Sequence, residues 1–99
     1  MKIRILSLAI QDIESGRRFY EQQQNSLGVY FLDSLFSDID SLLLYAGVHL
    51  LFFGYYRSLS KRFPYAIYYQ LNGETIEVWR VLDCRQNPAR VAKALGKSQ

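Results

Sequence analysis

Apolar and polar positions follow two different periods along this chain, and the change of period separates helices from strands. Residues 2–6 (KIRIL) alternate, with Ile3 and Ile5 on one face, which is typical of a strand. From Ser7 to about Gln24 the apolar positions recur at helical spacing, and Ser7 is the expected N-cap. The pattern therefore predicts a first strand that leads directly into a helix.

A second helix is predicted after the stretch QQQNSLG, which breaks the apolar pattern. Ser26 is its expected N-cap, and the helix should run from Leu27 to about Tyr45, with Gly47 ending it. The predicted apolar stripes of the two helices consist of Ala9, Ile10, Ile13, Gly16, Phe19, Tyr20, Phe31, Leu32, Leu35, Ile39, Leu42 and Leu43. Two helices with so short a join predict an antiparallel helical hairpin.

The period of strands begins with the stretch LLFFGYYRSLS and continues through Asn72-Gly73. Asn-Gly between two alternating runs is a strong hairpin signal, because both residues of such a turn need positive φ. A two-residue turn at this place fixes the register of the two strands. The expected pairs are Leu71–Glu74, Tyr69–Ile76, Ile67–Val78 and Tyr65–Arg80 on the core face, and Gln70–Thr75, Tyr68–Glu77 and Ala66–Trp79 on the other face.

A short C-terminal helix is predicted after the last strand. Asn87 is a suitable cap, Pro88 suits the first helical position, and Val91 with Leu95 forms an apolar edge. The other face of this helix is basic, with Arg90, Lys93 and Lys97. The elements together predict the α+β class: an N-terminal strand, a two-helix hairpin, a three-stranded antiparallel meander and the short helix, with helices packed on one face of the sheet. The length predicts a single domain, residues 1–99.

Composition excludes several classes of protein. No apolar run approaches the roughly 20 residues of a membrane span, and the N-terminus MKIRILSLAI has no small-residue cleavage site, so we expect a cytoplasmic protein without a membrane partner. Cys84 and His49 are each the only residue of their type, which argues against a zinc cluster. We therefore expect no metal and no cofactor, and we expect Cys84 to be a small buried apolar side chain. The net charge of +3 permits a nucleic-acid partner without arguing for one.

The acidic residues are scattered over the predicted helices and are expected to be solvated or to cap helix ends. They include Asp12, Glu14, Asp33, Asp38 and Asp40. The sequence has no paired carboxylates suited to acid–base catalysis, no Gly-rich phosphate loop and no Ser–His–Asp triad. Conventional hydrolases and nucleotide-binding enzymes are therefore not expected.

Four segments carry a resemblance to a known family. They are the pair Phe19-Tyr20 ending the first helix, the opening LGVYFLDSL of the second, RFPYAIYY on a strand, and Arg85, Asn87 and Pro88 after the last strand. With the order of elements, they resemble the RelE/ParE family of bacterial toxins, the toxin half of type II toxin–antitoxin (plasmid stabilisation) systems. Asn87 replaces the family's usual acidic residue before the proline and can still cap the helix. The resemblance covers most of the chain, implies a β-α-α-β-β-β fold, and is closer to the ParE-like branch.

The two branches of this family differ in their targets. ParE-like members inhibit DNA gyrase, RelE-like members cleave messenger RNA at the ribosome, and both are neutralised by a small antitoxin. The resemblance thus implies a toxin that binds gyrase and a cognate antitoxin. The alternatives are a RelE-like mRNA endonuclease acting with the ribosome and a degenerate, non-toxic binding module. A homodimer is left open.

Whether the protein is an enzyme depends on how complete the ribonuclease residues are. Ribonuclease members use a Lys and Arg cluster with a tyrosine near the C-terminus; here Arg85 matches, but Ala66 stands where they carry a strand arginine. No tyrosine follows Tyr69. Arg57 and Arg85 are the catalytic candidates of that alternative, which needs no metal. The residues expected to bind the target or the antitoxin are Arg57, Lys61, Arg62, Tyr65, Tyr68, Trp79, Arg80 and Arg85.

Two placements stay open at this point. The arginines and lysine of that set either gather at one edge of the sheet or act as ordinary solvated charges, with Arg80 on the core face stacking on Tyr65 or pairing with a helix carboxylate. Tyr68 and Trp79 are expected on the face away from the helical hairpin. There they are either covered by the C-terminal helix or free to anchor an antitoxin.

Overall fold

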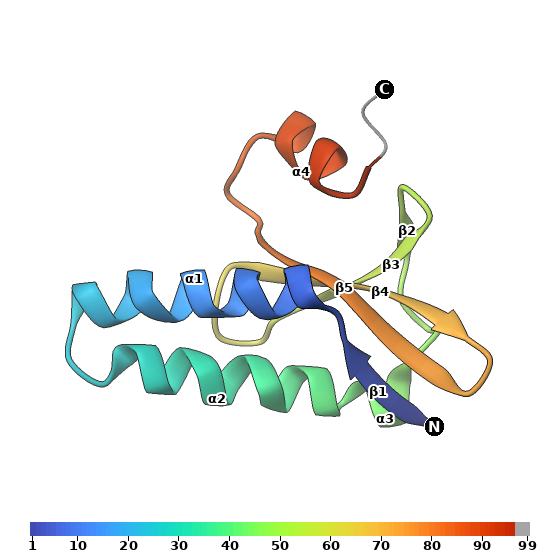
Figure 1. Cartoon of the computed structure of the whole chain (residues 1–99), viewed down its shortest axis with the longest axis horizontal. Coiled ribbons are helices and arrows are strands. Elements are labelled where there is room, and N and C mark those ends of the chain that lie inside the picture. The colour runs from blue at the N-terminus through green and yellow to red at the C-terminus, as the bar shows by residue number, and fades with distance from the viewer. Residues whose placement is uncertain (97–99) are drawn as a thin grey trace.

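A computed structural model describes residues 1–96. Lys97, assigned above to the basic helix face, lies outside the described residues. The elements are β1 (Lys2–Ile5), α1 (Ser7–Gln23), α2 (Leu27–Asp40), α3 (Leu42–Tyr45), β2 (Leu51–Phe52), β3 (Tyr55–Leu59), β4 (Tyr65–Asn72), β5 (Thr75–Asp83) and α4 (Pro88–Ala94) (Figure 1). Among residues 1–96 the strands form one sheet in the order β1-β5-β4-β3-β2. The predicted α+β class is confirmed, and the predicted meander corresponds to β3, β4 and β5.

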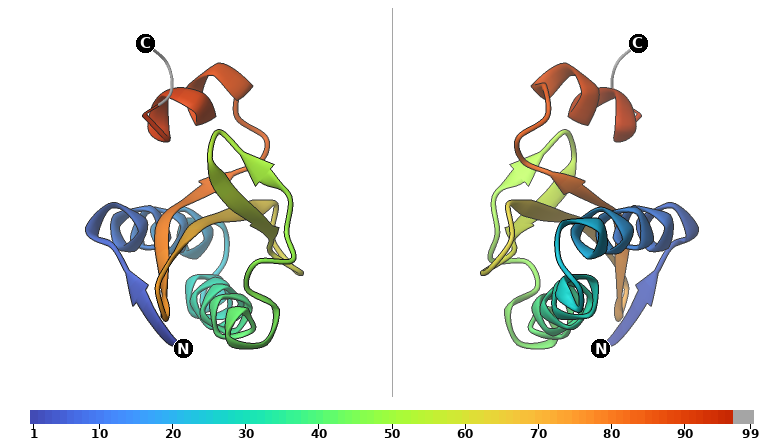
Figure 2. Two further views of the ribbon diagram at one scale, coloured as in Figure 1. Left: turned by 90° about the vertical axis from the view of Figure 1, so that its right-hand side faces the viewer. Right: turned by 90° about the vertical axis from the view of Figure 1, so that its left-hand side faces the viewer.

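The sheet separates two apolar layers. The helical hairpin of α1 and α2 packs on one face, where Ile67, Tyr69 and Val78 meet side chains such as Phe31 and Leu35. On the opposite face α4 packs through Val91 and Leu95 (Figure 2). β1 pairs with β5 in parallel, and the other neighbours are antiparallel. Since β1 ends at Ile5, the C-terminal half of β5 borders α1 instead of a strand.

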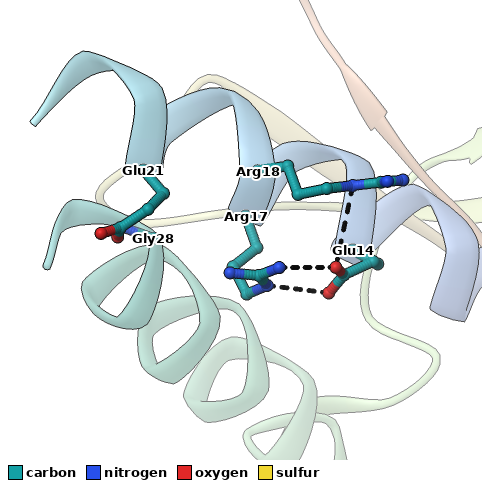
Figure 3. A network of polar contacts seen from close by, with 5 residues as sticks. All are labelled: Glu14, Arg17, Arg18, Glu21 and Gly28. Atoms are coloured by element: carbon teal, nitrogen blue, oxygen red, sulfur yellow. Dashed lines mark hydrogen bonds and ion pairs between the residues drawn. The ribbon is translucent and has the colours of Figure 1, made fainter. Parts of the chain in front are cut away.

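The helical hairpin is closed by a carboxylate instead of the predicted serine caps. Ser26 is the N-cap residue of α2 as predicted, but its backbone is left-handed (φ 71), and Ser7 is already the first helical residue of α1. Neither serine makes a side-chain cap bond in the described chain. Glu21 takes over this role. Its carboxylate accepts hydrogen bonds from the backbone N–H groups of Ser26 (3.1 Å) and Gly28 (3.0 Å). Figure 3 shows the Glu21 side chain reaching Gly28. A carboxylate at a helix N-terminus also interacts favourably with the helix dipole.

The second helix is shorter than predicted, and three stripe residues are not buried. The hydroxyl of Ser41 donates to the Asp38 carbonyl oxygen (2.6 Å), and the helix breaks there into α2 and α3. Side-chain bonds of this kind compete with the helical backbone ladder. Ile10, Phe19 and Leu43 are about half exposed, contrary to the prediction.

The β4–β5 hairpin forms where predicted, but its register differs. Asn72 pairs with Thr75, so the two central turn residues are Gly73 and Glu74. Gly73 has φ 61, and glycine at the first central position is the arrangement of a type II′ turn, in which the second residue needs no positive φ. All the predicted pairs are therefore displaced; Tyr69, for example, pairs with Val78 and not with Ile76.

A bulge then reverses the faces of the second half of β5. Tyr69 pairs with Val78 but Tyr68 pairs with Arg80, so Trp79 is the extra residue. The register shift at the turn is two residues. It leaves each side chain on its predicted face, because the faces of a strand alternate with a period of two. Beyond the bulge each side chain of β5 lies on the face opposite to the predicted one. Arg80 is no longer on the core face, and Val81 now lies on it, paired with Ile67.

Candidate functional site

Arg57 is at the centre of the most chemically varied surface of the sheet. Its position on β3, opposite Tyr68 of β4, directs it to the face that α4 covers. The Arg57 Nε donates to the Tyr68 hydroxyl (3.2 Å), and Nη2 contacts the Cys84 sulfur (3.6 Å). The guanidinium also lies 5.0 Å from the ring centroid of Phe52, a favourable cation–π distance. The guanidinium is thus oriented by groups from three strands or their ends.

A cleft of about 150 Å³ opens beside this guanidinium. Its walls come from the β2–β3 hairpin and from the start of α4, and its lining consists of Phe52, Phe53, Arg57, Tyr68, Cys84, Gln86, Pro88 and Val91. Asn87 holds this end of α4 in place, since its side chain accepts from the Ala89 N–H (2.7 Å) with Pro88 at the first helical position. These two cap predictions are confirmed.

Tyr68 and Trp79 differ in how far they are covered on this face. Tyr68 is only 3% exposed and packs with Ala66, Leu82 and the α4 residues Val91 and Leu95. The interpretation in which the C-terminal helix covers it is therefore confirmed for Tyr68. Trp79 stays 36% exposed, with its ring edge-on to Tyr55. Its part in binding a partner stays a prediction.

Cys84 is exposed and not buried as the sequence suggested. It follows the end of β5, where its N–H donates to the carbonyl of Pro64 (2.7 Å) and fixes its side chain beside Arg57. Partial desolvation raises the pKa of the thiol, and the nearby positive charge of Arg57 opposes this without reversing it. This shift disfavours the thiolate, which is the nucleophilic form of cysteine.

A second, wider cleft of about 370 Å³ lies on the other side of Arg57. Lys61, His49 and the buried Asp38 line it. The Asp38 carboxylate accepts hydrogen bonds from the Ser60 hydroxyl (2.6 Å) and from the Lys61 backbone N–H (3.3 Å). The His49 ring shares a hydrogen bond with the buried Tyr69 hydroxyl. Lys61 therefore joins Arg57 at one edge. Arg62 is exposed in the same β3–β4 loop, which agrees with a solvated charge.

Arg85 is held at the corner that follows β5. It forms a bidentate ion pair with Asp83 (2.7 and 3.0 Å), and this bond is the main reason why the pKa of the Asp83 carboxyl is lowered. Burial raises the pKa of Tyr65 to about 12, and the Asp83 charge adds to the shift. Tyr65 is 8% exposed in the main core. It is thus a weak candidate for contacting a partner, whereas the Arg85 side chain is 58% exposed and stays a candidate although Asp83 neutralises its charge.

Arg80 is part of the fold and does not belong to a cluster with Arg57. Its guanidinium forms a bidentate pair with Asp12 of α1 (2.7 and 2.9 Å) and donates to the carbonyl of Ala94 in α4 (3.2 Å). The pairing with a helix carboxylate, one of the two predicted alternatives, is confirmed, and the placement on the core face is wrong. The pKa of Arg80 is raised, chiefly by this bond. The five predicted basic residues therefore do not form one site.

Sequence reasoning missed three residues that line these clefts, Asp38, Phe52 and Phe53, and a fourth residue, Asp12, that positions Arg80. Asp12 and Asp38 were expected to be solvated or to cap a helix, yet each binds groups far away in the sequence. Phe52 and Phe53 form the wall of the Arg57 cleft. The available signal was the FFG sequence between two alternating runs, which places two rings at a hairpin tip.

The composition of the Arg57 cleft is that of a binding surface. Over residues 1–96, no group of three His, Cys, Asp or Glu side chains is placed to hold a metal ion. No helix of the described part is long and apolar enough to cross a bilayer. The Arg57 cleft offers a cation, three aromatic rings and the apolar side chains of Pro88 and Val91, which is the composition of an interface anchor.

Comparison with known proteins identifies the fold. No protein-family model matches the sequence, and no curated protein matches it significantly. Among solved structures, a chain from the chromosomal ParDE TA (toxin–antitoxin) system of P. aeruginosa superposes with a TM-score of 0.74, covering 82% of this chain and 92% of its own length. This is the RelE/ParE-like fold. Since the two sequences are 14% identical, the likeness shows the fold and leaves function to be argued from the site.

Proposed function

We propose that this chain is the toxin component of a toxin–antitoxin system, that it acts by binding DNA gyrase, and that a cognate antitoxin neutralises it in the cytoplasm. The likeness in fold to a chain of a ParDE system carries this proposal. The resemblance of the FPYAIYY segment to the ParE-like branch supports gyrase as the target.

The state of the ribonuclease positions favours binding over cleavage. Ala66, which stands where the ribonuclease members carry a strand arginine, is 0% exposed and lies beneath α4. Arg85 is neutralised by Asp83, and Arg57 lies between the Tyr68 hydroxyl and the Cys84 sulfur. General acid–base cleavage requires a complete and positioned set of catalytic groups. Here the strand arginine is replaced by Ala66 and the charge of Arg85 is neutralised.

The direct test is DNA supercoiling by purified gyrase with and without the purified chain. We expect inhibition at micromolar protein, weakened by Arg57→Ala, because this change removes the cation of the cleft. Arg18→Ala, an exposed arginine on α1, serves as the matched control and should leave inhibition unchanged. Unaffected supercoiling at this concentration would exclude gyrase as the target.

Transcript cleavage in a translating extract tests the RelE-like alternative. Cleavage by the wild-type chain that is lost in Arg85→Ala would replace our proposal with an mRNA endonuclease. If neither supercoiling nor transcripts are affected, the degenerate binding module is the remaining hypothesis.

A further inference from the structure

One end of the molecule carries apolar surface without charge. Residues 41–56 contain no Asp, Glu, Lys or Arg. They comprise α3, β2, the turns that follow each of them and the first two residues of β3, and they lie at the end turned to the viewer on the left of Figure 2. Eight of their apolar side chains are 43–80% exposed: Leu43, Leu44, Tyr45, Val48, Leu50, Leu51, Phe52 and Phe53. We name these eight side chains the 43–53 surface.

The eight side chains lie along one edge of the sheet, on both of its faces. Leu51 pairs with Tyr56, which packs against the main core, whereas Phe52 pairs with Tyr55, which packs against the α4 cluster. All eight are at least 43% exposed. A partner strand placed along this edge would cover apolar side chains of both faces.

The backbone at this surface is open for pairing. β2 is the last strand of the sheet, and in the described chain it is paired only with β3. The Leu50 carbonyl accepts from the Arg57 N–H (2.9 Å). Bonding alternates along an antiparallel pair, so the N–H and C=O of Leu51 point away from β3. An open edge flanked by apolar side chains is a template for another strand.

The tip of the β2–β3 hairpin is held in a strained conformation. Phe53 has φ 52 and Gly54 has φ 84, as a type I′ turn requires, but the first position normally takes Asn, Asp or Gly. A bulky side chain rarely adopts left-handed backbone. Strain of this kind points to a function of the residue that carries it. Here it presents the adjacent rings of Phe52 and Phe53 side by side, 6.2 Å apart.

We propose that the 43–53 surface is the interface of a two-fold symmetric homodimer, in which β2 pairs antiparallel with β2 of a second copy. A two-fold axis through the middle of the β2–β2 pair places the unpaired backbone groups of Leu51 opposite those of Leu51 in the second copy, as an isologous interface requires. Residues 41–56 contain no Asp, Glu, Lys or Arg, and the neighbouring Arg57 guanidinium already lies over the Phe52 ring. Two chains of net charge +3 can therefore meet here with little opposition between like charges. An acidic partner would be attracted instead to the side of α4, where Arg90 and Lys93 lie. This inference does not depend on the gyrase proposal.

Sedimentation velocity of the purified full chain at several concentrations tests this interface. We expect a concentration-dependent dimer, with a dissociation constant raised at least about tenfold by Leu51→Lys. Phe53→Asn should also weaken the dimer while raising the melting temperature of the dilute chain, because asparagine tolerates left-handed backbone. Val29→Lys is the matched control: Val29 is 56% exposed on α2 and Leu51 59% exposed on β2, so this change should leave the dimer intact.

Three results would overturn the proposal, once circular dichroism shows that each variant is folded. One is a wild-type chain that is monomeric at every concentration. Another is equal weakening by Leu51→Lys and Val29→Lys, which would indicate non-specific association. The third is a monomer that binds its antitoxin less tightly when Leu51 is changed to lysine, which would assign the surface to the antitoxin. Each result is distinct from the supercoiling readout.

Discussion

Asp12 shows how one side chain can connect three elements. Its carboxylate accepts from the Arg80 guanidinium and from the Val81 N–H (3.0 Å), and Arg80 in turn donates to the carbonyl of Ala94. This joins α1 to the open half of β5 and to α4. It also satisfies a backbone donor that would otherwise be unpaired at the sheet edge.

We expect Asp12→Ala to lower the free energy of unfolding by about 2–4 kcal/mol, because it leaves a partly buried guanidinium and a backbone N–H without their acceptor. Urea denaturation measures the change. Asp33→Ala, an exposed carboxylate on α2, is the matched control and should change stability by at most about 0.5 kcal/mol. Equal effects of the two substitutions would contradict this role of Asp12.

Tyr65 makes the fold sensitive to alkali. Its pKa is raised to about 12 in the folded chain, whereas an unfolded tyrosine titrates near 10. The stabilising contribution is therefore complete below about pH 10, and it is lost as the pH rises through 12, because the unfolded state ionises first. We expect the melting temperature to fall between pH 10 and 12, with a smaller fall in Tyr65→Phe. The same dependence of melting temperature on pH in the wild type and in Tyr65→Phe would contradict this role of Tyr65.

At the scale of elements, the close approach of the two helices of the hairpin depends on glycine. A Cβ at Gly28 would lie 2.7 Å from the Arg17 carbonyl oxygen, and a Cβ at Gly16 would lie 2.5 Å from the Phe31 ring. At both positions the lack of a side chain lets α1 and α2 pack at this distance.

We expect Gly28→Ala to destabilise the chain by about 1–3 kcal/mol, because the backbone oxygen of the neighbouring helix has to move. Helix propensity alone predicts the opposite sign, a gain of roughly 1 kcal/mol. The sign of the change in thermal unfolding therefore decides between the two causes. A stabilised variant would show that the helices are packed less tightly than described.

The elements themselves were predictable because their signals are local. The strand KIRIL, the two helices and the final cap at Asn87 follow from periodicity and cap residues within a few positions of each other. The hairpin was also predictable, but not its register: the choice between turns centred on Asn72-Gly73 and on Gly73-Glu74 depends on which strand pairs bury the core. The bulge at Trp79 is set by the same packing and has no sequence signature of its own.

The candidate site was predictable only in part, for the same reason. Arg57 was identified through the resemblance, but its neighbours Phe52 and Cys84 come from distant parts of the chain. Of the two alternatives left open for the basic residues, the gathering of all five at one edge is wrong, because the bulge moves Arg80 to Asp12. Contacts between residues far apart in the sequence decide which charges are free to bind.

At the scale of the whole molecule, charge and apolar surface are separated. The described segment that follows β5, residues 84–96, carries Arg85, Arg90 and Lys93 and no acidic residue. The 43–53 surface is uncharged. Together with the Arg57 cleft, this distribution offers one side to an acidic partner and one end to an apolar partner, which suits a protein that acts through its contacts.

Growth after induced expression is the most direct test of the central claim that this chain is a toxin. We predict arrest when the wild-type chain is produced alone, relief when the cognate antitoxin is produced with it, and attenuated arrest for Arg57→Ala at equal protein level. Normal growth with folded wild-type protein present in the cell would contradict the claim.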